Sequence, residues 1–120
     1  MKVTVLGAGE QGHVLTYWMA RHPQVTEVIV ADWNKERADE VAARVGANKA
    51  KAAQVDARDV EQTAALAEGS RLIINAVMPE WCHYVMQAAL KTKAHYQDMS
   101  TGISGALVDE VAKQLALDEP

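Results

Sequence analysis

The chain lacks several features that mark particular classes of protein. Cys82 is the only cysteine in 120 residues, so an internal disulfide is excluded and we expect this side chain to be a small core residue. The longest apolar runs are far shorter than the roughly 20 residues that a membrane-spanning helix needs. No basic and apolar leader opens the sequence. We therefore expect a cytoplasmic protein without a membrane partner.

Positive charge is also scarce. The chain has 12 Lys and Arg residues against 16 Asp and Glu residues, a net charge of −4, whereas a nucleic-acid-binding surface needs a basic face. The histidines and the cysteine lack the spacing of a zinc site. The neighbours Cys82 and His83 point about 100° apart on a helix and do not easily share a metal. We expect neither nucleic acid nor a metal ion to bind.

No segment rich in Pro, Ser or Gly divides the chain, and 49% of its residues are hydrophobic. These features predict one domain over residues 1–120. Apolar runs and helical periodicities alternate five times, which predicts an α/β fold with a doubly wound parallel sheet in three α-β-α layers. The expected strands are residues 1–6, 27–32, 52–55, 71–77 and 95–100. The expected helices are residues 12–21, a segment from an Asn34 cap to Gly46, a segment from an Asp59 cap to Gly69, a segment that carries Trp81, Val85 and Ala89, and residues 104–117.

The first expected helix has an apolar stripe made of Val14, Leu15, Trp18 and Met19. Helical periodicity places these residues on one face, which we expect to be buried. Trp81 lies on a similar face of a later helix and is also expected in the core.

The first strand leads into a glycine-rich turn, Gly7-Ala8-Gly9-Glu10-Gln11-Gly12. Gly7 permits a sharp exit from the strand, Gly9 leaves room for a pyrophosphate, and Gly12 lets the next helix pack closely on the sheet. The pyrophosphate then lies over free amide groups at the start of that helix. The turn therefore predicts a dinucleotide-binding unit.

An acidic residue, Asp32, follows twenty residues after Gly12, at the end of the second apolar run. A carboxylate at this position accepts hydrogen bonds from the adenosine ribose hydroxyls and repels a 2′-phosphate, which favours NAD. Lys35 and Arg37 follow closely and leave NADP open. A scaffold of this fold that has lost its ligand is the alternative.

Three further motifs follow the glycine-rich turn in the order Val55-Asp56-Ala57-Arg58-Asp59, Ile73-Ile74-Asn75-Ala76-Val77-Met78-Pro79 and His95-Tyr96-Gln97-Asp98-Met99-Ser100. Together they resemble the N-terminal cofactor domain of the saccharopine dehydrogenase and lysine 6-dehydrogenase family over nearly the whole chain. The resemblance implies a Rossmann fold and an NAD- or NADP-dependent oxidoreductase of amino-acid metabolism that interconverts a C–N single bond and an imine. In that family a second α+β domain supplies much of the substrate site. We therefore interpret the chain as the N-terminal fragment of a longer two-domain enzyme, inactive by itself.

The resemblance also assigns cofactor contacts to positions along the chain. The pyrophosphate would be wrapped by Gly7, Gly9, Glu10, Gln11 and Gly12; the adenosine ribose would be bordered by Asp32, Trp33 and Asn34; the adenine would lie beside Asp56 and Ala57; and the nicotinamide side would be lined by Asn75, Ala76, Val77, Met78 and Pro79. A hydrogen bond without ligand contact is the alternative role for Asn75.

Tyr96 and Asp98 fall at the carboxyl end of the last expected strand, where open α/β sheets place ligands. By resemblance they face the substrate cleft, Asp98 as the group that holds a substrate amine and Tyr96 as the group that orients it. A strand aromatic and a capping aspartate are the alternatives. The amino-acid substrate would bind through the missing downstream domain, and apolar surface left by that domain permits a homodimer.

Two other functions fit parts of the pattern. A non-catalytic NAD-binding regulatory domain, as in potassium channels, shares the glycine-rich turn and the acid but lacks the later motifs. The cofactor domain of a sugar-type dehydrogenase has a proline near the end of its fourth strand, but it usually continues to a Glu-Lys-Pro turn after the fifth. This chain has Gln97-Asp98-Met99-Ser100 there.

Overall fold

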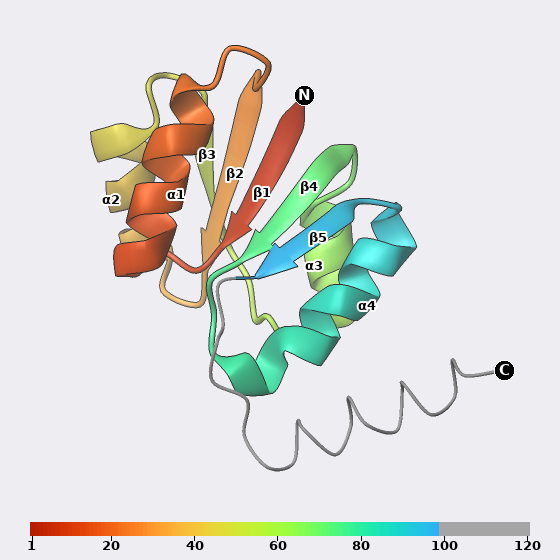
Figure 1. Ribbon diagram of the computed structural model, residues 1–120. Coiled ribbons are helices and arrows are strands. Elements are labelled where there is room, and N and C mark those ends of the chain that lie inside the picture. Colours follow the sequence, from red (N-terminus) through yellow and green to blue (C-terminus); the bar gives the residue numbers. More distant parts are fainter. Residues whose placement is uncertain (99–120) are drawn as a thin grey trace, which may run out of the picture.

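A computed structural model describes residues 1–98, which form an open sheet of five parallel strands in the order β3-β2-β1-β4-β5 (Figure 1). The chain alternates between strands and helices throughout. The elements are β1 (Lys2–Leu6), α1 (Glu10–Arg21), β2 (Glu27–Asp32), α2 (Lys35–Val45), β3 (Ala50–Gln54), α3 (Val60–Leu66), β4 (Ser70–Asn75), η1 (Pro79–Trp81), α4 (Cys82–Thr92) and β5 (His95–Asp98). The predicted α/β fold with a doubly wound parallel sheet is confirmed.

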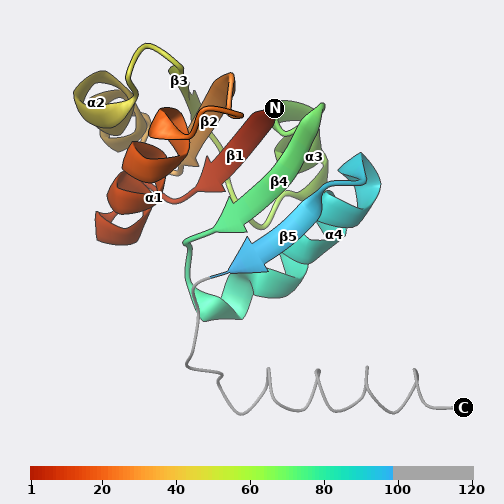
Figure 2. The same ribbon diagram turned by 45° about the horizontal axis from the view of Figure 1, so that its top comes forward.

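The helices form two layers on opposite faces of the sheet. Figures 1 and 2 show α1 and α2 on one face and α3 and α4 on the other. On the first face, Val3 and Val5 of β1 pack with Val28 and Ile74. On the second face, Leu6 belongs to a cluster that reaches α3 and α4. Because both faces are covered, the central strands are apolar on both sides, as buried parallel strands usually are.

Local signals correctly predict where several helices begin and end. The Asn34 side chain caps α2 by accepting a hydrogen bond from the Arg37 amide at 3.3 Å, and the Asp59 side chain caps α3 by accepting one from the Gln62 amide at 3.0 Å. The C-cap of α2 is Gly46, as predicted. Short polar side chains serve this purpose because their oxygen reaches an otherwise unpaired amide in the first turn.

The predicted inner face of α1 is wrong for two of its four residues, Val14 and Trp18. Val14 is 53% exposed and Trp18 is 62% exposed, although Leu15 and Met19 are partly buried against the sheet. The buried residues of α1 are small: Gly12, Thr16 and Ala20. They lie four residues apart and form a flat strip, so the helix approaches the sheet too closely for a tryptophan to fit between them.

Boundaries of other elements differ by a few residues from those expected. The fourth strand ends at Asn75 instead of residue 77, and the third begins at Ala50 instead of residue 52. Trp81 is partly buried against the core, and Cys82 is buried as predicted. The expected helix at 104–117 and the end of the last strand at 99–100 lie outside the described residues. Within residues 1–98, no helix is both long enough and apolar enough to span a bilayer.

Candidate functional site

The glycine-rich turn connects β1 to α1 by a path that only glycine permits at two points. Gly7 has φ +104°, in a region that side chains rarely adopt. A Cβ on Gly12 would lie 1.7 Å from the Gly7 carbonyl oxygen, so the helix begins in direct contact with the turn. A Cβ on Gly9, in contrast, would have no atom within 4 Å. The protein itself therefore does not require glycine at position 9, whereas a ligand lying over the turn would.

The start of α1 lies open beside this space. Its N-cap is Gly9, and no side chain caps the first turn. The first amide groups of a helix have no partner within the helix, and they carry the positive end of its dipole. An uncapped glycine-rich helix start can therefore receive a phosphate group.

The Asp32 carboxylate lies at the end of β2, where it hydrogen-bonds both to the glycine-rich turn and to the residue that caps α2. Its Oδ2 accepts a hydrogen bond from the Ala8 amide at 2.7 Å, and its Oδ1 accepts one from the Asn34 amide at 2.8 Å. Each carboxylate oxygen keeps further acceptor capacity. Asp32 therefore holds the glycine-rich turn in place and still presents acceptor oxygens at the carboxyl end of β2.

These elements enclose a groove of about 280 Å³ at the carboxyl ends of the strands. The register explains the arrangement, because Leu6 of β1 pairs with Ala31 of β2 on one side and with Asn75 of β4 on the other. The groove thus crosses the point where the strand order changes direction. Its walls are made by Gly7, Gly9, Ala31, Asp32, Trp33, Arg37, Val55, Ala57, Ala76, Val77, Met78 and Trp81.

Some predicted contact residues do not line this groove. Asn34 caps α2, and Gln11 is exposed on α1. Asp56 pairs with Arg58 through two hydrogen bonds, at 3.0 and 2.9 Å, and the guanidinium keeps the pKa of the Asp56 carboxyl below its ordinary value. The Arg58 guanidinium also lies 5.4 Å from the centre of the Trp81 ring. Asp56 therefore positions the loop after β3, while the groove wall beside it is formed by Ala57.

Sequence reasoning missed three wall residues as site residues, Ala31, Val55 and Trp81, whereas Arg37 was expected only to leave NADP open as a cofactor. Ala31 and Val55 directly precede the predicted Asp32 and Asp56, so inspecting strand ends for neighbours would have found them. No sequence signal separates a groove-lining Trp81 from a core one.

Polar side chains of β4, β5 and the start of α4, none of which lines the groove, form a connected network. The Asn75 Nδ2 donates to Tyr96 Oη at 3.1 Å and to Cys82 Sγ at 3.3 Å, while Asn75 Oδ1 accepts from the Val77 amide at 3.0 Å. The Tyr96 hydroxyl donates to Asp98 Oδ2 at 3.0 Å. Burial raises the pKa of the Tyr96 hydroxyl and of the Cys82 thiol. The structure therefore brings the predicted residues Asn75, Tyr96 and Asp98 together.

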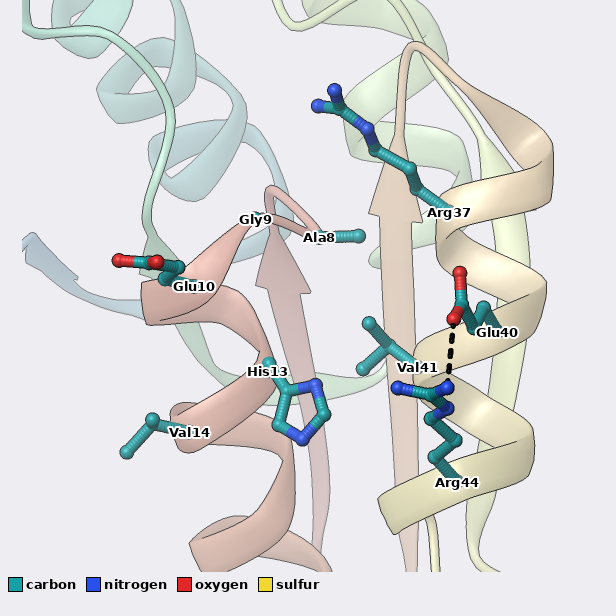
Figure 3. Close-up of a pocket in the computed structure, with 9 residues that line it drawn as sticks. All are labelled: Ala8, Gly9, Glu10, His13, Val14, Arg37, Glu40, Val41 and Arg44. Carbon is teal, nitrogen blue, oxygen red and sulfur yellow. Dashed lines mark ion pairs between the residues drawn. The ribbon is translucent and has the colours of Figure 1, made fainter.

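A second and larger cavity, of about 500 Å³, lies between α1 and α2 (Figure 3). It shares Gly9 and Arg37 with the groove. Figure 3 shows the Arg37 side chain extending from α2 in the direction of the turn, whereas Glu40 and Arg44 are joined by an ion pair of 3.4 Å. Glu10 and His13 line the cavity from α1. Residues 1–98 contain no group of three His, Cys, Asp or Glu side chains able to hold a metal ion.

An open parallel sheet with this strand order, a glycine-rich turn at its first strand and an acid at its second defines a Rossmann-type dinucleotide-binding domain. The family model described as the saccharopine dehydrogenase NADP binding domain matches residues 3–118, and the chain belongs to this family. The predicted family is thereby confirmed, and the chain is an NAD(P)-binding domain of saccharopine dehydrogenase-like oxidoreductases.

One relative agrees with this assignment, and solved structures agree with the fold. The chain is 32% identical over 99 residues to carboxyaminopropylagmatine dehydrogenase of Synechocystis sp., a match that covers 81% of this chain and 25% of that protein. Among solved structures, apo saccharopine dehydrogenase (L-Glu forming) from Saccharomyces cerevisiae has a TM-score of 0.75 at 23% identity, covering 90% of this chain and 23% of that one. Quinate dehydrogenase from Corynebacterium glutamicum in complex with NAD has a TM-score of 0.54 at 19% identity, covering 79% and 43%. The chain thus spans about a quarter of the length of the first two relatives.

Proposed function

We propose that this chain is the cofactor half of an oxidoreductase that interconverts a C–N single bond and an imine in an amino-acid-derived substrate. The observation that carries the proposal is the open space over Gly9, bounded by an uncapped helix start and by Asp32. Two relatives are dehydrogenases whose names refer to amino-acid-derived compounds. Because this chain spans about a quarter of each, we propose that a further domain supplies the rest of the substrate site.

In this proposal, different residues of the groove contact different parts of the cofactor. Gly9 and the open start of α1 hold the pyrophosphate, Asp32 and Trp33 border the adenosine ribose, and Ala57 lies beside the adenine. Ala76, Val77 and Met78 line the nicotinamide half, because β4 lies on the opposite side of β1 from β2. The bound nicotinamide would supply hydride transfer.

The choice between NAD and NADP depends on two groups in this proposal. The Asp32 carboxylate disfavours a 2′-phosphate, so we propose that NAD binds more tightly. Arg37 lines both cavities and is the better placed of the two nearby cations to accept a 2′-phosphate, because the Lys35 ammonium is paired with Asp39. We therefore propose that NADP also binds, with lower affinity than NAD.

On the substrate side, we propose that Asp98 presents a negative charge to a substrate amine and that Tyr96 orients the carboxylate. The hydrogen bond from Tyr96 Oη to Asp98 Oδ2 supports this role, since it fixes one oxygen of a half-buried carboxylate at the edge of β5. A charge-assisted contact to an ammonium is stronger when the carboxylate is already oriented.

The test is to titrate the chain separately with NAD and NADP by calorimetry, then repeat both titrations with Asp32→Ala. We expect wild-type protein to bind both and to prefer NAD. Loss of the ribose contact in Asp32→Ala should weaken NAD binding by about 1.5–3 kcal/mol. NADP binding should weaken less, because removing the carboxylate also removes its repulsion of the 2′-phosphate.

Arg37→Ala and Lys35→Ala form a matched pair of controls. We expect Arg37→Ala to weaken NADP more than NAD, and Lys35→Ala to leave their ratio unchanged. Absence of binding of both dinucleotides to the wild-type chain, or equal weakening of both by Asp32→Ala, would contradict the assignment of the ribose site.

A further inference from the structure

Asn75 is the last residue of β4 and is 1% exposed, yet all the polar atoms of its side chain have partners. These partners belong to three elements: the loop after β4 through Val77, the first residue of α4 through Cys82, and β5 through Tyr96. A buried amide is costly unless it is fully hydrogen-bonded. Because all of these hydrogen bonds are made, Asn75 holds the three elements in one arrangement.

The orientation of the Asn75 amide follows from its partners. A backbone N–H can only donate, so the amide atom that faces Val77 must be the oxygen. The nitrogen must then face Tyr96 and Cys82. The side chain has one arrangement that satisfies every partner, so it can hold the loop at one position.

The loop that Asn75 holds is a wall of the cofactor groove. Ala76, Val77 and Met78 line the groove, and Met78 is 55% exposed there. On the side of β1, the Ala76 amide donates to the Leu6 carbonyl at 2.7 Å, and the Ala76 carbonyl oxygen lies 2.8 Å from where a Cβ on Gly7 would be. The Asn75 amide holds the loop from the other side, at the next residue along the chain.

We infer that Asn75 is a positioning residue that sets the nicotinamide half of the groove without touching the cofactor. This inference rests on the proposed function, because it assigns the loop at residues 76–78 to one half of a dinucleotide. Asp32 and the start of α1, which serve the other half, lie across β1, and the hydrogen bonds of the Asp32 carboxylate go to the Ala8 and Asn34 amides. Removing the Asn75 amide should therefore affect the two halves of the ligand unequally.

The experiment compares NAD with ADP, which ends at the pyrophosphate, on the wild-type chain, Asn75→Ala and Ser70→Ala. Ser70 is the matched control because it begins the same strand, is 5% exposed and makes a buried hydrogen bond of 2.7 Å with Thr4. We expect Asn75→Ala to weaken NAD binding about tenfold, because the loop at residues 76–78 is then no longer held and one buried hydrogen bond is worth about this much. The affinity of Asn75→Ala for ADP should stay within about twofold of the wild-type affinity. Ser70→Ala should bind both ligands with wild-type affinity.

Equal weakening of NAD and ADP by Asn75→Ala, or no weakening of either, would overturn the inference. Failure of the wild-type chain to bind NAD and NADP is a different result and would overturn the proposed function instead. Hydrogen exchange of the Val77 amide in the wild-type chain gives a second measurement if Asn75→Ala does not fold. We expect slow exchange, because this loop amide donates to a buried acceptor, and exchange as fast as in an unstructured peptide would overturn the inference.

Discussion

The carbonyl oxygen of Gly7 occupies the space into which any side chain on Gly12 would project, only 1.7 Å from an ideal Cβ. The end of β1 and the first turn of α1 are therefore in direct backbone contact. Gly9 lies between them in sequence, yet a Cβ there would meet nothing within 4 Å. The same motif thus contains a glycine that the fold requires and a glycine that only a ligand requires.

Gly12→Ala and Gly9→Ala should separate stability from binding. Gly12→Ala forces two backbone segments apart and should lower the free energy of unfolding by about 3 kcal/mol. The Gly9 backbone, with φ −80° and ψ −159°, suits any residue, so Gly9→Ala should be as stable as wild type. It should lose dinucleotide affinity, because its methyl group occupies the space of the pyrophosphate. Urea unfolding and NAD titration measure the two effects. Equal stability of the two variants would contradict the interpretation of Gly12.

Thr16 offers a test of buried polarity. Its side chain is fully buried on α1, and its Oγ1 has no hydrogen-bond partner among the described residues. Thr16→Val replaces the hydroxyl with a methyl group of similar size, which should raise the free energy of unfolding by about 1 kcal/mol. Thr63→Val is the matched control, because Thr63 is equally buried but donates to the Asp59 carbonyl at 3.0 Å. It should lower stability, and the same sign for both variants would refute this reasoning.

The environment of Tyr96 predicts how stability depends on pH. Burial raises the pKa of its hydroxyl in the folded protein, whereas the unfolded chain should release this proton near pH of about 10. Above that pH the folded state binds one more proton than the unfolded state, so stability falls by up to about 1.4 kcal/mol for each pH unit. Below about pH 10 the hydroxyl is protonated in both states and causes no loss of stability. Tyr96→Phe should lose less stability than wild type between about pH 9 and 11, as measured by denaturant unfolding, and parallel pH profiles would exclude the effect.

The single thiol provides a probe of local opening. Cys82 is 4% exposed, and burial raises the pKa of its thiol. Because the thiolate is the reactive species, we expect alkylation by iodoacetamide to be at least about tenfold slower in native protein than in urea. Mass spectrometry after timed quenching gives both rates. Equal rates would mean that the α4 end of the sheet opens readily in the native state.

Several features of the fold could be predicted because their causes are local in sequence. Asn34 and Asp59 reach amides only three residues away, so their capping roles do not depend on the rest of the protein. The inner face of α1 could not be read in this way. Its stripe of large apolar residues favours one face, but the contact between Gly12 and Gly7 turns the small residues toward the sheet and leaves Trp18 exposed.

The same distinction between local and long-range causes applies to the candidate site. The sequence by itself determined the glycine-rich turn, the acid at the end of β2 and the alternation of strands and helices, because each depends on backbone conformation or on short-range periodicity. Only the tertiary structure decided that Arg37 lines two cavities and that Asn75 meets Tyr96. Both outcomes depend on which segments, distant in sequence, lie side by side in the folded chain. Pairing of β4 with β5 brings Asn75 to Tyr96 across twenty-one positions of sequence, a distance over which no local pattern acts.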